Sequence, residues 1–139
     1  MLATANRESR TVKSPHISSE HFLLGAVAYG RGLGSSILAN AGLQADALRA
    51  HLAQVGWTKE EVSHGYGVST RPVFIASVRH ADALGHREIE PEHIILGLLE
   101  EQPGGGAATA LVHFCVDVSG ARQAIIERIS HGPDSTRAA

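Results

Sequence analysis

Apolar residues in the first half of the chain recur at the three- and four-residue spacing of amphipathic helices. The clearest stripe lies in EHFLLGAVAYG, where positions 22, 23, 26 and 27 fall on one helical face and Ser19 precedes them as a predicted N-cap. The segments between the stripes contain glycines and a Ser-Pro step, as expected at helix ends. The pattern predicts helices over residues 2–13, 20–30, 34–42 and 45–56.

The second half repeats this organisation, and no segment alternates in the way that a half-buried strand does. Pro72 stands near the first turn of RPVFIASVRHADALG, where a helix tolerates proline. Four further helices are predicted over residues 71–85, 91–101, 106–114 and 119–130. We therefore expect an all-α fold, followed by a polar tail at residues 132–139 that is predicted to be disordered.

The two halves carry the same string where a helix begins. SSEHFLLG places Glu20 and His21 before an apolar run, and PEHIILG places Glu92 and His93 in the same way, 72 positions later. Such self-similarity is the signature of a structural repeat. We divide the domain, residues 1–131, into two repeats and a linker: 1–56, 72–131 and 57–71.

Two features of the string indicate packing. Gly25 and Gly97 lie inside predicted helices, where glycine costs about 1 kcal/mol relative to alanine, so we expect another helix to approach closely there. His21 and His93 recur in register, which fits a structural hydrogen bond inside each repeat better than a ligand contact.

Composition restricts the class of protein. The 139 residues are 43% apolar but only 4% aromatic, which predicts an aliphatic core, and the net charge of −2 argues against binding to nucleic acid. The single cysteine, Cys115, cannot form an internal disulfide and lies in an apolar run, LVHFCV, so we expect a buried thiol. No apolar run reaches membrane-spanning length. We expect a cytoplasmic protein that binds no membrane.

No motif indicates catalysis, a metal or a cofactor. The nine histidines include no H-E-x-x-H pair, and one cysteine excludes the usual thiolate zinc sites. The segments GRGLGSS and GGGAAT lack the Gly-Lys-Ser/Thr of a nucleotide-binding loop. No nucleophile motif is present, so we predict a protein that is not an enzyme.

The strings ISSEHFLLG and IEPEHIILG, each followed by a glycine-rich turn, resemble the double Clp-N repeat domain. This is the N-terminal module of Clp-type AAA+ unfoldases such as ClpC and ClpA, here without the ATPase modules. The segment ADALGHREIEPEHIILGLL also matches the Leu-Gly-His that precedes the signature in the family. The resemblance covers almost the whole chain. It implies an all-α, pseudo-twofold bundle of two four-helix repeats.

The resemblance also implies a function. Such domains do not catalyse; they dock substrates and adaptor proteins, and in some members the signature glutamate faces the guanidinium of a phosphorylated arginine. Glu20 and Glu92 match that glutamate, Ser19 and Pro91 match a threonine of the signature, and Thr70 lies near another expected threonine. The candidate ligand-binding residues are Glu20, Glu92, His21, His93, Ser19 and Thr70.

A carboxylate can bind the guanidinium fork while helix N–H groups bind the phosphoryl oxygens. Glu20 and Glu92 could also simply complement helix dipoles, worth about 0.3–1 kcal/mol each. Because Pro91 cannot act as a hydroxyl cap, peptide or adaptor docking is favoured over phosphoarginine recognition. Two alternatives stay open: a decoy that sequesters cyclic peptide antibiotics directed at Clp, and a fragment of a complete Clp ATPase.

Overall fold

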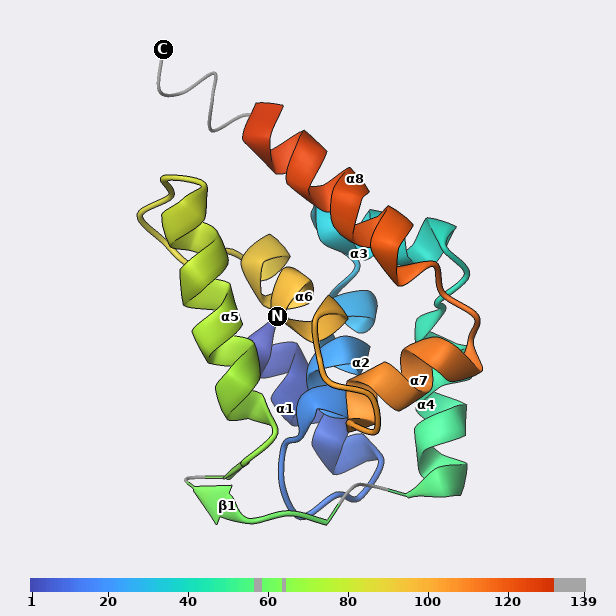
Figure 1. The fold of residues 1–139 in the computed structure, drawn as a ribbon. Helices are drawn as coiled ribbons and strands as arrows, with labels where there is room; N and C mark the ends of the chain where they lie inside the picture. The colour runs from blue at the N-terminus through green and yellow to red at the C-terminus, as the bar shows by residue number, and fades with distance from the viewer. Residues whose placement is uncertain (57–58, 64, 132–139) are drawn as a thin grey trace.

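The computed structural model describes residues 1–56, 59–63 and 65–131, and helices make up most of this part of the chain (Figure 1). The all-α prediction is confirmed, and each helix end lies within two residues of its predicted place. The predicted tail at residues 132–139 lies outside the described residues. The elements are α1 (Leu2–Thr11), α2 (Ser19–Tyr29), α3 (Leu33–Asn40), α4 (Ala45–Val55), β1 (Val62–Ser63), β2 (Tyr66–Gly67), α5 (Thr70–Ala83), α6 (Pro91–Leu99), α7 (Gly106–His113) and α8 (Val118–His131).

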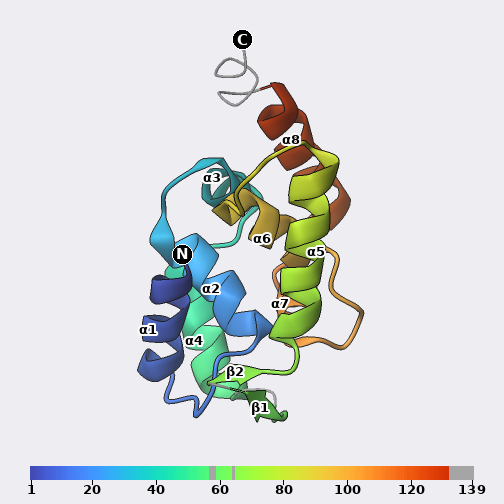
Figure 2. The same ribbon diagram turned by 90° about the vertical axis from the view of Figure 1, so that its left-hand side faces the viewer.

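The two repeats are related by reciprocal contacts. α1 packs on α2 in the first repeat, and α5 packs on α6 in the second. α2 and α6 contact each other, and Figure 2 shows them between α1 on one side and α5 on the other. Contacts also cross between repeats: α2 packs on α7, and α6 packs on α3. The molecule is therefore an interlocked pseudo-twofold bundle.

The repeated glycines lie where the paired helices approach most closely, which confirms the packing prediction. A Cβ atom on Gly25 would lie 2.7 Å from the Cα atom of Ala5 in α1. A Cβ atom on Gly97 would lie 2.7 Å from the backbone oxygen of Val73 in α5. Each repeat thus uses one glycine to bring its first two helices together.

A short hairpin before α5 was not predicted. β1 and β2 pair antiparallel, and Tyr66 of β2 also forms a parallel bridge with Ile17. The Tyr66 ring lies 6.0 Å from the rings of Phe22 and Phe74, between the two repeats. Strands of two residues are too short to show an alternating pattern, so the sequence carries no signal for them. The hairpin ties the connection between the repeats to the start of α2.

Buried aliphatic side chains from both repeats form one continuous core. Leu24, Leu48, Leu96 and Ile125 have no exposed surface, and they come from α2, α4, α6 and α8. Among the described helices, none is by itself long and apolar enough to cross a membrane; only α2 and α3 taken together, bent by 98°, pass on length and composition.

The prediction that Cys115 is buried was wrong. Its side chain is exposed, and its backbone adopts φ = 55° in the turn that follows α7. The apolar run continues past the end of the helix and does not face the core throughout: Leu111 is 2% exposed and Phe114 and Val116 pack against the core, whereas Val112 is 76% exposed.

Candidate functional site

The signature histidines cap their own helices. The Nδ1 atom of His21 accepts the backbone N–H of Ser18 at 2.8 Å, and Nδ1 of His93 accepts the N–H of Glu90 at 2.8 Å. Both rings are 1% exposed. The predicted structural hydrogen bond is therefore confirmed in both repeats. As candidate ligand residues, His21 and His93 have this nitrogen committed to the fold.

The N-cap of α2 is Ser18, so the prediction of Ser19 was wrong by one residue. Ser18 has the extended backbone of a cap (φ −112°, ψ 178°), and Ser19 is the first helical residue. Two adjacent serines offer the same local signal, and the choice is made by tertiary contacts. The Oγ atom of Ser19 accepts the backbone N–H of Ala107, which lies in α7 of the other repeat, at 3.2 Å.

Glu20 lies against the start of the same helix. It is the second residue of α2, it is 3% exposed, and its carboxylate is so close to Gly106 that any side chain there would collide with it. Gly106 is the first residue of α7, where the helix dipole favours a negative charge. Glu20 also lines a small hollow of about 150 Å³, together with His51.

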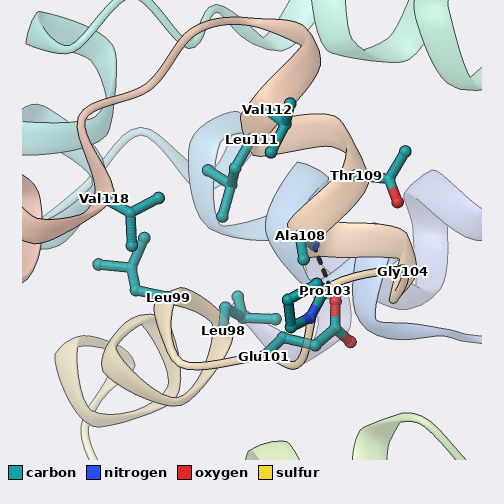
Figure 3. A pocket seen from close by; sticks show the side chains of 10 residues that line it. All are labelled: Leu98, Leu99, Glu101, Pro103, Gly104, Ala108, Thr109, Leu111, Val112 and Val118. Carbon is teal, nitrogen blue, oxygen red and sulfur yellow. Dashed lines mark hydrogen bonds between the residues drawn. The ribbon is translucent and has the colours of Figure 1, made fainter.

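A second carboxylate occupies the first turn of α7. Oε1 of Glu101 accepts the backbone N–H of Ala108 at 2.8 Å, as the dashed line in Figure 3 shows. Sequence analysis missed Glu101, although an acidic residue just before a helix that starts with glycine is a recognisable signal for such a cap. Two carboxylates and the Ser19 hydroxyl thus surround the start of α7.

Glu92 occupies the reciprocal position. It is the second residue of α6, it is half-buried, and a Cβ atom on Gly32 would lie 2.9 Å from its Oε1 atom. Gly32 is the N-cap of α3 and has φ = 87°, which favours glycine. Each signature glutamate therefore lies at the start of the third helix of the other repeat. The structure places Glu20 and Glu92 at two different helix starts.

Thr70 lies beside the first-repeat signature. It is 3% exposed, and its hydroxyl donates to the backbone oxygen of Gly67 at 2.8 Å. Its neighbour Ser69 accepts the backbone N–H of Ser19 at 3.1 Å. Glu60, which sequence analysis also missed, accepts the Ser69 N–H at 2.9 Å and hydroxyl at 2.7 Å. The starts of α2 and α5 are thus joined, and the Thr70 hydroxyl is committed to the fold.

Helix α5 and the hairpin before it carry an exposed apolar surface, which we call the α5 face. Its apolar members are 50–59% exposed. Two hollows, of about 620 and 430 Å³, lie along α5 and share Arg71 and Ile75. The residues of the α5 face are Val62, Val68, Arg71, Ile75 and Val78.

A second apolar groove lies on the other side of the turn that follows α6. Figure 3 shows its side chains converging from the end of α6, from α7 and from the start of α8. Its volume is about 360 Å³. The apolar side chains that line it include Leu98, Leu99, Pro103, Leu111, Val112 and Val118.

Comparison with known proteins gives consistent similarities. Residues 66–139 match the family model of the Clp repeat (R) N-terminal domain. The chain is 34% identical over 134 residues to the chaperone protein ClpC3, chloroplastic, of Oryza sativa subsp. japonica, covering 93% of this chain and 14% of that protein. It is 30% identical over 141 residues to the negative regulator of genetic competence ClpC/MecB of Bacillus subtilis (strain 168), covering 100% of this chain and 17% of that protein.

The chain therefore spans 14–17% of the length of these two relatives. Among solved structures, it is similar to the N-terminal domain of the caseinolytic protease associated chaperone ClpD from Arabidopsis thaliana. The TM-score is 0.75 at 22% identity, over 92% of this chain and 91% of that one, which shows a shared fold.

Proposed function

Because this chain belongs to the Clp repeat (R) N-terminal domain family, we propose that it is a non-catalytic docking domain for peptide segments of substrates or adaptor proteins that a Clp-type ATPase handles. The observation that carries this proposal is the α5 face. Contiguous exposed apolar surface, bordered by hollows, is typical of protein interaction sites.

The charges beside the α5 face indicate the kind of segment that would bind. Arg71 borders both hollows and is exposed. In the larger hollow Arg79 donates to Glu100 at 2.7 Å, and Glu101 accepts the N–H of Ala108, so these side chains already have partners. Glu61 lines the smaller hollow together with Arg71. This surface is complemented by a segment whose aliphatic side chains pack on Ile75 and whose acidic side chain pairs with Arg71. Burying one aliphatic side chain contributes about 1.5–3 kcal/mol, which suits a transient complex.

The test is binding to a permanently unfolded, acidic protein, reduced and carboxymethylated α-lactalbumin, measured by fluorescence anisotropy. We expect Ile75→Asp to weaken binding about tenfold or more, since tenfold corresponds to ~1.4 kcal/mol. Val112→Asp, at an exposed position in the other groove (76%, against 59% for Ile75), is the matched control and should bind as the wild type does. Equal binding by wild type and Ile75→Asp would refute docking at the α5 face.

For phosphoarginine, Glu92 is the better supported position. Near Glu20, the N–H groups of Ala107 and Ala108 already donate to Ser19 and Glu101, and Glu101 adds a negative charge that would repel a phosphoryl group. The half-buried Glu92 carboxylate adjoins the start of α3, whose glycine N-cap has no side chain to cap the first N–H groups. That arrangement offers both a carboxylate and anion-binding N–H groups.

Calorimetric titration with free phosphoarginine and with an unmodified arginine peptide tests this finer proposal. We expect a preference for the phosphorylated ligand that Glu92→Gln removes and that Glu20→Gln leaves unchanged. If wild-type protein shows no preference, phosphoarginine recognition is lost while peptide docking at the α5 face is unaffected. The same titration with a cyclic peptide antibiotic tests the decoy hypothesis.

A further inference from the structure

His93 makes a second contact besides its cap. Its Nε2 atom lies 2.8 Å from the Nδ1 atom of His86, which stands in the connection between α5 and α6. The two ring centroids are 5.0 Å apart, with an angle of 58° between the planes. The backbone N–H of His86 donates to the oxygen of Ala81 at 2.9 Å, which fixes its position at the end of α5. Glu90, His93 and His86 thus form a directed chain of hydrogen bonds.

The direction of this chain determines where the protons are. Because Nδ1 of His93 accepts the N–H of Glu90, the proton of the neutral His93 ring must be on Nε2. The Nε2–H group then donates to Nδ1 of His86, which must carry no proton. The contact therefore requires both rings to be neutral.

An added proton cannot be accommodated without breaking a contact. On Nδ1 of His93 it would displace the N–H of Glu90, and on Nδ1 of His86 it would place two N–H groups against each other. Burial lowers the pKa of His93, the neighbouring His86 and the more distant His80 lower it further, and only Glu92 opposes them. His86 is half-buried on a connection, so its ring can turn toward water at less cost than His93.

The charged groups around this pair come from three elements. His86 approaches from the connection, His80 from α5 and Glu92 from α6 itself. His80 contacts Glu100 at the end of α6, and that carboxylate also accepts Arg79. Glu100 therefore compensates positive charge on α5, and the connection itself adds the charges of Arg87, Glu88 and Glu90 beside the pair.

We propose that the contact between His86 and His93 is an acid-sensitive latch that holds the connection between α5 and α6 against the first turn of α6. At neutral pH the latch is closed. Acidification protonates the pair, His86 turns out, and residues 87–90 are released while the bundle stays folded. The position that corresponds to His86 in the first repeat is Ser14, which does not titrate. The device therefore belongs to the second repeat and lies beside Glu92.

The test is nuclear magnetic resonance of the whole chain between about pH 7.5 and about pH 5, in a buffer with EDTA so that no metal bridges the rings. Long-range proton–nitrogen spectra should show both rings as Nε2–H tautomers at the upper pH. Hydrogen-exchange protection of the Glu90 N–H, which Nδ1 of His93 accepts, should fall about tenfold on acidification, the change expected when one buried hydrogen bond is lost.

The decisive variant is His86→Asn, whose side-chain oxygen can accept the Nε2–H of His93 but does not titrate. We expect it to remove the pH dependence of protection at the Glu90 N–H. His21→Asn, at the matching cap of the first repeat, is the control and should leave that dependence in place. The latch is refuted if protection in the wild type does not vary with pH, if His86→Asn responds as the wild type does, or if His93 carries its proton on Nδ1.

Discussion

In each copy of the repeated signature, the histidine contacts its own repeat and the adjacent glutamate contacts the other repeat. His21 turns back to the N–H of Ser18 in its own repeat, whereas Glu20 lies against Gly106 of the other repeat. His93 and Glu92 divide in the same way, toward Glu90 and Gly32. One residue of each pair therefore stabilises a helix start locally, and the other joins the repeats. This division accounts for the occurrence of the same two residues in both halves.

The buried cap of His21 predicts an acid dependence of stability. Burial lowers the pKa of His21 below its ordinary value of 6.5, more than Glu20 and Glu60 raise it. As the pH falls below 6.5, the unfolded chain therefore binds a proton before the folded protein does, and the free energy of unfolding falls until the pH passes the folded-state pKa. Above pH 6.5 this contribution is fully present.

Replacing His21 by Asn keeps an acceptor for the Ser18 N–H but removes the titration. We expect His21→Asn to lower the free energy of unfolding by about 1 kcal/mol at neutral pH and to make its decline on acidification shallower. Urea unfolding at a series of pH values measures both quantities. A decline as steep as that of the wild type would show that His21 does not titrate with a lowered pKa.

At the scale of the elements, the short third helices depend on the other repeat. Eight-residue helices such as α3 and α7 are too short to be stable alone in water. The start of α7 contacts Ser19 and Glu20 of α2, and the start of α3 contacts Glu92 of α6. The glycines inside α2 and α6 serve a different contact, the one between the first two helices of each repeat.

The helical glycines lead to a second prediction. Gly25→Ala and Gly97→Ala should each destabilise the protein by about 1–3 kcal/mol, because the new Cβ atom would meet the backbone of the neighbouring helix. Gly120→Ala in α8 is the matched control. There a Cβ atom would meet only the side chain of Asp117, which caps α8 by accepting the Gly120 N–H at 3.1 Å. The loss of this cap and the gain in helix propensity, each about 1 kcal/mol, should therefore nearly cancel. Chemical denaturation measures all three; a stabilised Gly25→Ala variant would contradict the close packing.

Helix existence and helix ends could be predicted because they depend on local signals. The spacing of apolar residues, the helix-ending glycines and Pro72 all act within a few positions along the chain. The contact of Glu20 with the start of α7 could not be predicted, since it depends on how one repeat packs on the other. The choice of Ser18 over Ser19 as the cap has the same cause, because Ser19 is engaged by Ala107. Glu20 and Glu92 thus lie in the first turns of α2 and α6, as the local signals predicted, whereas their contacts with the other repeat could not be inferred.

At the scale of the whole molecule, the repeats share one core and are not independent domains. The continuous core includes side chains from both halves, and cross-repeat contacts join α2 to α7, α6 to α3 and α3 to α8. Arg49 of α4 binds Glu8 of α1 with two hydrogen bonds of 2.7 and 3.2 Å, so the first repeat also has its own ion pair. One partly buried ion pair contributes much less free energy of folding than the core contacts that a separated repeat would lose.

Separating the repeats should therefore abolish folding. We expect peptides of residues 1–56 and 65–131 to show little helical circular dichroism alone and no cooperative thermal transition, because each exposes the apolar surface that the other covers. Mixed at equal concentrations, they should regain helicity in a concentration-dependent way, since the cross-repeat contacts need no covalent connection. A Glu20→Lys change in the first peptide should weaken this reassociation, because it would place a positive charge at the start of α7. Cooperative unfolding of either peptide by itself would show that one repeat is a complete folding unit, and the interlocked contacts would then be an interface between two domains.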